Sequence, residues 1–178
     1  MKSDGGPTES WLIITGTMGA GKTAVVGEAS DILAHRRIVH AAIHPNALGL
    51  AHLPSAARCD GVMYDNLRSI CRNYAAVGVR RFLLARAIEG SAQLELCRDT
   101  IPAVNTVVCR LTASIETMQR RVQMRDTGML QREYVARVAK LNDILDRALL
   151  EDFAVINENR SLTDVALEIL IKAGWIAN

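Results

Sequence analysis

Residues 11–23 read Trp11-Leu-Ile-Ile-Thr-Gly16-Thr-Met-Gly-Ala-Gly21-Lys22-Thr23. Four apolar residues lead into a turn rich in glycine, and an amphipathic run follows the turn as far as Leu33. The apolar run predicts a buried strand, and the spacing of apolar residues after the turn predicts a helix over 22–34. The stretch therefore predicts a strand, a glycine-rich turn and a helix in direct succession.

The turn has the spacing Gly-x4-Gly-Lys-Thr, which is the pattern of a phosphate-binding loop when a strand precedes it and a helix follows it. Its glycines allow positive φ angles, so that backbone N–H groups turn inward and, with the positive end of the helix, hold a phosphate. Lys22 would reach the β- and γ-phosphates, and the Thr23 hydroxyl would ligate Mg²⁺. We therefore expect ATP and Mg²⁺ as cofactors, with contacts from Gly16, Thr17, Gly19, Ala20, Gly21, Lys22, Thr23 and Ala24.

The 178 residues are enough for one domain with a sizeable core. A hydrophobic content of 49% and a mean hydropathy of +0.12 fit a globular protein. We expect a polar N-terminal tail over 1–10 and a single domain over 11–178. No apolar run approaches the length of a membrane span, and no signal segment opens the sequence, so we expect a cytoplasmic protein with no membrane partner.

Cysteine, histidine and arginine contents narrow the chemistry. The four cysteines lie far apart without a C-x2-C pair, which indicates reduced thiols; the four histidines also lack metal spacing. A net charge of +2 with 4% aromatic residues gives little support to a nucleic-acid-associated ATPase. However, 17 of the 21 basic residues are arginine, and six lie between Arg110 and Arg137. Arginine suits forked contact with phosphate.

Strand and helix patterns alternate along the rest of the chain. Apolar segments predict strands over 37–43, 81–85, 104–111 and 153–156. Helical periods or caps predict helices from Asn46 to about Leu53 (stopped by Pro54), over 60–77 (ended by Gly78), over 92–98 (before Pro102), from 114, over 131–150, and over 161–173 from a capping box. This alternation predicts one α/β domain with a parallel sheet covered on both faces.

The whole length resembles small P-loop kinases such as adenylylsulfate kinase, gluconate kinase, chloramphenicol phosphotransferase and the tunicamycin-resistance protein. The stretches that carry this resemblance are GTMGAGKT (16–23), AIHPNALG (42–49), VRRFLLARAI (79–88), VVCRLTASIETMQRRVQMRDTG (107–128) and FAVINENRSLTDVALEIL (153–170). The resemblance implies a P-loop NTPase fold: a three-layer α/β/α sandwich whose five-stranded parallel sheet has the order 2-3-1-4-5, with an arginine-bearing lid.

The resemblance also implies roles for residues outside the loop. In such kinases an arginine after the fourth strand packs on the adenine, and lid arginines grip the transferring phosphate. Arg121 and Arg125 fall at those positions, with Arg120 and Arg132 as near alternatives. The turn that begins at Asn157 would frame the base. Arg86, at the end of the third strand, would point at the acceptor.

One departure from the family pattern concerns the general base. Relatives commonly carry an aspartate at the end of the second strand, where this chain reads His44-Pro45-Asn46, and the third strand also ends without a carboxylate. A neutral His44 could act as base, because an unperturbed imidazole has a pKa of about 6.5. His44 could equally be a polar residue at a strand end. Substitutes that could reach the pocket, or lie solvated, are Asp60, Asp65 and Glu89.

The leading hypothesis is an ATP-dependent phosphotransferase that acts on a hydroxyl of a small molecule such as a metabolite, nucleoside or antibiotic. Its catalytic residues would be Lys22, His44 and Arg125, its acceptor-binding residues His44 and Arg86, and its metal ligand Thr23. The alternative is an ATP-binding regulatory or resistance protein whose degenerate site transfers little. No nucleic-acid partner is expected, and a homodimer is compatible with the sequence.

Overall fold

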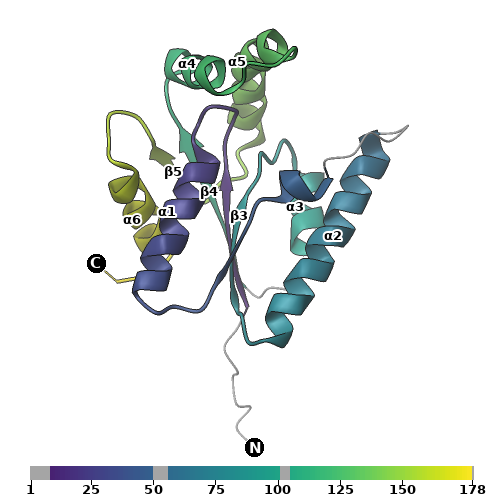
Figure 1. Cartoon of the computed structure of the whole chain (residues 1–178), viewed down its shortest axis with the longest axis vertical. Helices are drawn as coiled ribbons and strands as arrows, with labels where there is room; N and C mark the ends of the chain where they lie inside the picture. Colours follow the sequence, from purple (N-terminus) through teal and green to yellow (C-terminus); the bar gives the residue numbers. More distant parts are fainter. Residues whose placement is uncertain (1–8, 50–55, 101–104, 178) are drawn as a thin grey trace, which may run out of the picture.

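The computed structural model describes residues 9–49, 56–100 and 105–177 (Figure 1). Five parallel strands form one sheet in the order β2-β3-β1-β4-β5. They are β1 (Ser10–Thr15), β2 (Ala41–Ile43), β3 (Arg81–Ala85), β4 (Asn105–Thr112) and β5 (Phe153–Ile156). The predicted parallel sheet and its strand order are therefore confirmed.

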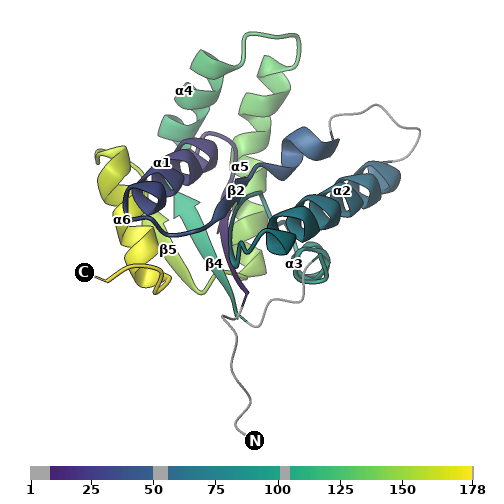
Figure 2. The same ribbon diagram turned by 60° about the horizontal axis from the view of Figure 1, so that its bottom comes forward.

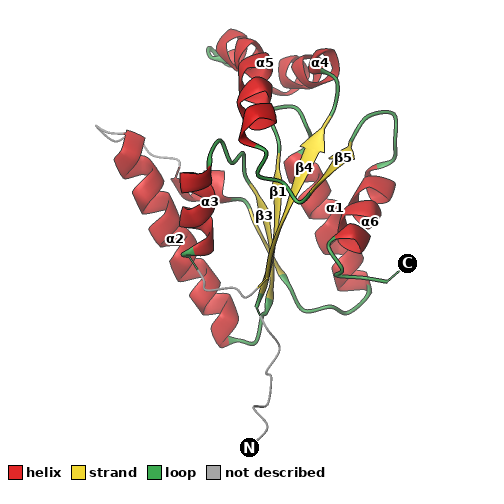
Figure 3. Cartoon of the chain, turned by 180° about the vertical axis from the view of Figure 1, so that it is seen from behind, coloured by secondary structure: helices red, strands yellow, loops and turns green. Residues whose placement is uncertain are grey.

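Helices cover both faces of the sheet, which gives the three predicted layers. They are α1 (Lys22–His35), the 3-10 helix η1 (Pro45–Gly49), α2 (Ala56–Ala76), α3 (Ser91–Arg98), α4 (Ile115–Arg125), α5 (Gln131–Ala148) and α6 (Leu162–Lys172). Helices α1 and α6 pack together on one face, and α2 and α3 lie on the other (Figures 1 and 3). Helices α4 and α5 pack against each other beyond the carboxyl ends of the strands (Figures 1 and 2).

The central strand β1 contributes to two hydrophobic cores. Leu12 and Ile14 point into the core beneath α1 and α6, and Trp11 and Ile13 point into the core beneath α2 and α3. All four are at most 1% exposed, and the Trp11 ring stacks on Phe82 with 5.3 Å between ring centroids. Burial on both faces explains why the strand reads as a continuous apolar run. It also fixes the position of the glycine-rich turn that follows.

Local signals placed several helix ends correctly. The Ser114 hydroxyl accepts a hydrogen bond from the Thr117 N–H, and Ser161 accepts one from the Asp164 N–H, so both serines cap helices. Gly78 follows α2 with a φ of 94°, a left-handed conformation that glycine adopts readily. Among the described helices, none is long and apolar enough to cross a membrane.

Three predicted boundaries were wrong, and one of them is the start of the helix predicted over 60–77, which begins at Ala56. The strand predicted over 37–43 begins only at Ala41, because Arg37 is left-handed (φ 57°) and the Arg37 and Ile38 N–H groups bond back to α1. The helix predicted to be capped by Asn46 begins instead at Pro45, whose missing N–H would have no partner in the first helical turn. Some predictions concern residues outside the described part of the chain. These are most of the N-terminal tail, His52, Leu53, Pro54, the Cys59 side chain and Pro102.

Candidate functional site

The glycine-rich turn of residues 16–21 has the backbone that a phosphate-binding loop requires. Gly19 and Gly21 have φ angles of 77° and 95°. A Cβ at Gly19 would collide with the Met118 backbone carbonyl, and one at Gly21 would collide with the Asn157 side-chain amide. Both positions therefore need glycine for conformation and for space.

Two long-range side chains hold the outer edge of this loop. The Asn157 amide, just after β5, donates a hydrogen bond of 2.8 Å to the Ala20 carbonyl. The Arg121 guanidinium, on α4, donates to the carbonyls of Gly19 (3.2 Å) and Asn157 (2.9 Å). These bonds occupy carbonyl oxygens of the loop and fix its peptide planes. The resemblance implies that Arg121 and Asn157 lie near the nucleotide base, and this stays a prediction; in the structure both contact the loop backbone.

Lys22 folds back onto the loop. Its Nζ donates to the carbonyls of Gly16 (2.8 Å) and Thr17 (2.9 Å). Burial, with a further contribution from the positive charge of Arg125, lowers the Lys22 pKa to about 8. The partners of the ammonium group among the described residues are backbone carbonyls, and a phosphate beside it would favour the charged form.

A cavity of about 350 Å³ opens beside the loop, and we call it the phosphate cavity. It is lined by Gly19, Gly21, Lys22, Thr23, Ala24, Arg121 and Arg125. Thr23 and Ala24 lie in the first turn of α1, where free N–H groups and the helix dipole favour an anion. The Arg125 side chain is 63% exposed and forms a fork with Asp126, with nitrogen–oxygen distances of 3.1 Å and 2.6 Å. The structure thus brings Lys22, Thr23, Arg121 and Arg125 together.

A second cavity of about 380 Å³ also reaches Lys22, and we call it the acceptor cavity. It is lined by Met18, Lys22, Asn46, Asp60, Arg86, Ala87, Glu89, Gln93, Tyr134, Arg137 and Leu141. Two ion pairs cross it: Arg86 to Asp60 at 3.2 Å, and Arg137 to Glu89 at 2.9 Å. Lys22 is therefore shared by the two cavities.

Arg86 is the most firmly held of these charged residues. It follows β3 directly, is 8% exposed, and lies with its guanidinium carbon 5.2 Å from the centroid of the Tyr64 ring. Its Nη1 contacts the Asn46 side-chain oxygen at 3.5 Å, and its Nη2 donates to Asp60. Arg86, which the resemblance implies at the acceptor site, therefore lines the acceptor cavity.

Other predicted site residues lie elsewhere. His44 follows β2 and lines neither the phosphate cavity nor the acceptor cavity. Its Nδ1 is buried and has no hydrogen-bond partner among the described residues. Asp65 pairs with Arg68 on α2, and the alternative lid arginines are exposed and line neither cavity; these are Arg120 and Arg132.

Arg137 and Gln93 are cavity residues that sequence reasoning did not assign to the site. The neighbours of Arg137 on α5, Val138 and Leu141, are buried, which orients this part of α5 toward the sheet. The position of Arg137 beside a buried helix face was a signal that could have identified it. Gln93 follows the loop after β3, and its Oε1 accepts a hydrogen bond from the Glu89 N–H at 2.8 Å.

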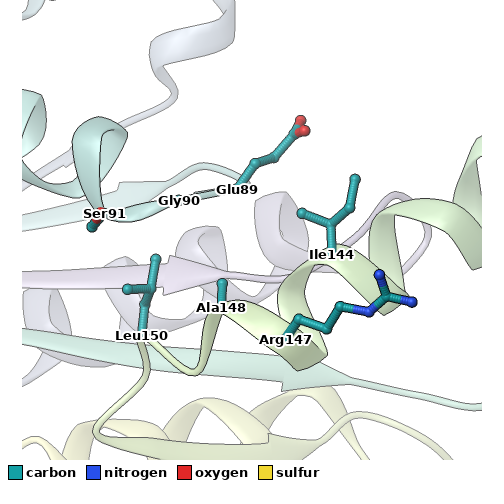
Figure 4. A pocket seen from close by; sticks show the side chains of 7 residues that line it. All are labelled: Glu89, Gly90, Ser91, Ile144, Arg147, Ala148 and Leu150. Carbon is teal, nitrogen blue, oxygen red and sulfur yellow. The ribbon is translucent and has the colours of Figure 1, made fainter.

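A third hollow, of about 370 Å³, lies between the loop after β3 and the end of α5 (Figure 4). It is lined by Glu89, Gly90, Ser91, Ile144, Arg147, Ala148 and Leu150. None of its lining residues belongs to the phosphate-binding loop. The three cysteines whose side chains are described are also remote from this chemistry: Cys71, Cys97 and Cys109 are buried, and burial raises the pKa of Cys71 and Cys109 to about 12.

Thr23 is the residue that could ligate a metal ion in the phosphate cavity. Over residues 9–49, 56–100 and 105–177, no group of three or more His, Cys, Asp or Glu side chains could hold a metal ion alone. Mg²⁺ commonly uses one or two protein ligands together with substrate phosphates and water. The exposed Thr23 hydroxyl in the phosphate cavity fits that mode.

Comparisons with known proteins identify the fold. No family model and no curated protein sequence matches the chain. Among solved structures, a gluconokinase from Sinorhizobium meliloti matches with a TM-score of 0.63 at 16% identity, covering 96% of this chain and 94% of the other. APS kinase of Mycobacterium tuberculosis, in complex with AMPPNP and APS, matches at 0.64 and 18% identity, covering 96% and 100%.

The tunicamycin resistance protein of Deinococcus radiodurans matches with a TM-score of 0.62 at 17% identity, covering 93% of this chain and 96% of that protein. A sugar kinase and a shikimate kinase also match. All of these structures are similar to this chain over nearly its whole length, and they agree with its five-stranded order β2-β3-β1-β4-β5. The chain has the fold of the small P-loop kinases.

Proposed function

We propose that this protein is an ATP-dependent phosphotransferase that moves the γ-phosphoryl group of ATP to a hydroxyl of a small molecule. The observation that carries the proposal is that Lys22 lines both the phosphate cavity and the acceptor cavity. A nucleotide in the first cavity and an acceptor in the second would meet at this one cation. The acceptor would be a metabolite, a nucleoside or an antibiotic.

Each loop residue has a role in this proposal. The N–H groups of the loop and of the first turn of α1 would hold the β-phosphate, with Gly16, Thr17 and Ala20 shaping the cradle. Lys22 would neutralise charge on the γ-phosphoryl group as it passes. The Thr23 hydroxyl would hold Mg²⁺ together with the ATP phosphates, and the ion would supply further neutralisation of phosphate charge.

The lid arginines would complete the charge neutralisation. Arg125 would leave its fork with Asp126 and contact the transferring group, while Arg121 and Asn157 would keep the loop in shape beside the base. The Arg125 side chain is 63% exposed and that of Asp126 is 24% exposed, and the pair joins neighbouring residues at the surface, so breaking it costs about 1 kcal/mol or less. His44 as the base stays a prediction: it follows β2 at the carboxyl edge of the sheet but lines neither cavity.

The experiment is mass spectrometry of a small-molecule extract incubated with the protein and ATP. A metabolite that gains the mass of one phosphoryl group, with the wild type and not without protein, would support the kinase and identify the acceptor. If the protein binds ATP but no such product forms, the proposed kinase activity is rejected.

The second candidate is an ATP-binding regulatory or resistance protein with little transfer activity. The observation that favours it is that β2 and β3 are followed directly by His44 and Arg86, where related kinases commonly carry a carboxylate. In this case wild type would bind ATP yet transfer poorly at every pH, and His44→Asp would raise transfer. Transfer that is robust in the wild type would exclude this candidate.

A further inference from the structure

Transfer to a hydroxyl needs a group that takes the hydroxyl proton. The carboxylates that line the acceptor cavity beside Lys22 are those of Asp60 and Glu89. The helical residue Asp65, by contrast, lines neither cavity and pairs with Arg68 on the surface of α2. Asp60 and Glu89 are therefore the candidate proton acceptors in the acceptor cavity.

The two carboxylates differ in how firmly they are held. Glu89, whose side chain is 33% exposed, pairs with Arg137, whose side chain is 52% exposed, and a pair with two solvent-accessible partners fixes geometry weakly. Asp60 pairs with Arg86, whose side chain is only 10% exposed and which also packs on Tyr64 and contacts Asn46. The partner of Asp60 is thus immobilised by the fold at the end of β3, and the partner of Glu89 is not.

Among the described residues, the Asp60 carboxylate uses only one of its two oxygens in hydrogen bonding. Arg86 binds its Oδ1 at 3.2 Å, and no hydrogen bond from another described residue reaches Oδ2. The Asp60 side chain is 51% exposed, and it faces the cavity that also contains Lys22. One oxygen is therefore oriented by the protein while the other can accept a hydrogen bond from a ligand.

We propose that Asp60, oriented by Arg86, is the proton acceptor for phosphoryl transfer, an inference that rests on the proposed function. The acceptor oxygen forms a bond to the γ-phosphorus, and the bond from that phosphorus to the bridging oxygen breaks. ADP leaves with the electron pair, and the hydroxyl proton moves to an Asp60 carboxylate oxygen and then to solvent. A carboxylate is a sufficient base because the transition state is loose and the proton moves late. Arg86 is then a positioning residue.

The test compares Asp60→Asn with the matched control Asp65→Asn on the same helix. Transfer from γ-³²P-labelled ATP into a small-molecule extract is measured beside the affinity for a fluorescent ATP analogue. Asp60→Asn should lower the transfer rate by about 10²-fold or more and leave the analogue affinity within about twofold, as expected for loss of a general base. Asp65→Asn should behave as wild type, and Asp60→Glu should recover part of the rate.

The pH profile separates Asp60 from His44. With Asp60 as base, the acid limb of the wild-type rate persists in His44→Ala and disappears from the residual activity of Asp60→Asn. A transfer rate of Asp60→Asn within about threefold of wild type would overturn the assignment while leaving the kinase intact. An acid limb that is lost in His44→Ala and kept in Asp60→Asn would overturn it as well. A wild type that binds the analogue but labels no compound would reject the proposed function and the assignment together.

Discussion

The phosphate cavity and the acceptor cavity share Lys22 but are built in different ways. The phosphate cavity is formed mainly by one contiguous stretch and α4, and its loop backbone is held by Asn157 and Arg121 through hydrogen bonds to carbonyls. The acceptor cavity combines side chains from η1, α2, the loop after β3, and α5. Its charged groups are held by two ion pairs, and in one of these both side chains are at least 33% exposed.

This difference predicts where change is tolerated. The loop needs glycine at positions with positive φ and close backbone contact, so a small substitution there disturbs the whole cradle. An exposed ion pair contributes about 1 kcal/mol or less, so much of the acceptor cavity can rearrange around a new ligand at low cost. We therefore expect nucleotide binding to be sensitive to loop variants, and the acceptor to depend on few fixed groups.

The largest expected effect is that of Lys22→Ala. The variant should lose productive ATP binding and, with it, turnover, because a preorganised cation is removed from the transferring phosphate. Titration with a fluorescent ATP analogue and circular dichroism would measure binding and folding. The exposed residue Lys140 gives the control variant Lys140→Ala. Unchanged ATP affinity in a folded Lys22→Ala variant would mean that the phosphate cavity is not the nucleotide-binding site.

Arg125→Ala should lower turnover much more than ATP affinity, by about 10³-fold, because a lid arginine acts mainly on the transition state. Steady-state kinetics with the identified acceptor, or background ATP hydrolysis, would measure the effect. Arg120→Ala, on the same helix but outside both cavities, is the matched control. A turnover within about threefold of wild type corresponds to roughly 0.7 kcal/mol of activation free energy or less, and it would mean that Arg125 has no catalytic role.

The pH dependence of ATP binding tests the state of Lys22. Its pKa is lowered to about 8, so the free protein loses this charge above that pH, whereas bound phosphates favour the charged form. Binding must then take up a proton, and affinity should fall by up to about tenfold per pH unit above 8. Lys22→Arg should abolish this limb, and Arg125→Ala should shift it to higher pH by removing a positive neighbour. A flat wild-type profile from pH 7 to about 10 would contradict the account.

Asn157→Ala gives the smallest expected effect. It removes the hydrogen bond to the Ala20 carbonyl, and a lost bond of this kind costs about 1 kcal/mol, which corresponds to roughly five- to tenfold weaker ATP binding. Asn159→Gly in the same turn, where Asn159 is left-handed with a φ of 54°, is the control and should leave ATP affinity near wild type. Calorimetric titration with a non-hydrolysable ATP analogue would compare them. Equal affinities would mean that the loop keeps its shape without Asn157.

Sequence reasoning succeeded where a local pattern determines the structure. The run before Gly16, the serine caps at Ser114 and Ser161, and the alternation of strands with helices depend on neighbouring residues, and the structure confirms them. It failed at Arg37, where the chain closes α1 instead of starting β2, because the left-handed turn depends on hydrogen bonds back to the helix rather than on an apolar pattern.

The acceptor cavity shows the same limit over longer distances. Arg137 and Glu89 are 48 positions apart, and Arg86 and Asp60 are 26 apart, so no spacing rule predicts either pair. The contacts of Arg121 with Gly19 and Asn157 likewise depend on how α4 and the turn after β5 pack against the loop. Each of these groupings is a consequence of tertiary packing, and only the phosphate-binding loop itself could be recognised from the order of its residues.

The central claim is that a phosphoryl group passes from the phosphate cavity to an acceptor beside Lys22. The most direct measurement uses ATP carrying ¹⁸O in its γ-phosphoryl group, with a small-molecule extract as the source of acceptor and mass spectrometry as the readout. The account predicts an organic product that carries the labelled phosphoryl group intact with wild type and lacks it with Lys22→Ala. Label found solely in inorganic phosphate, at the same rate for both proteins, would contradict it.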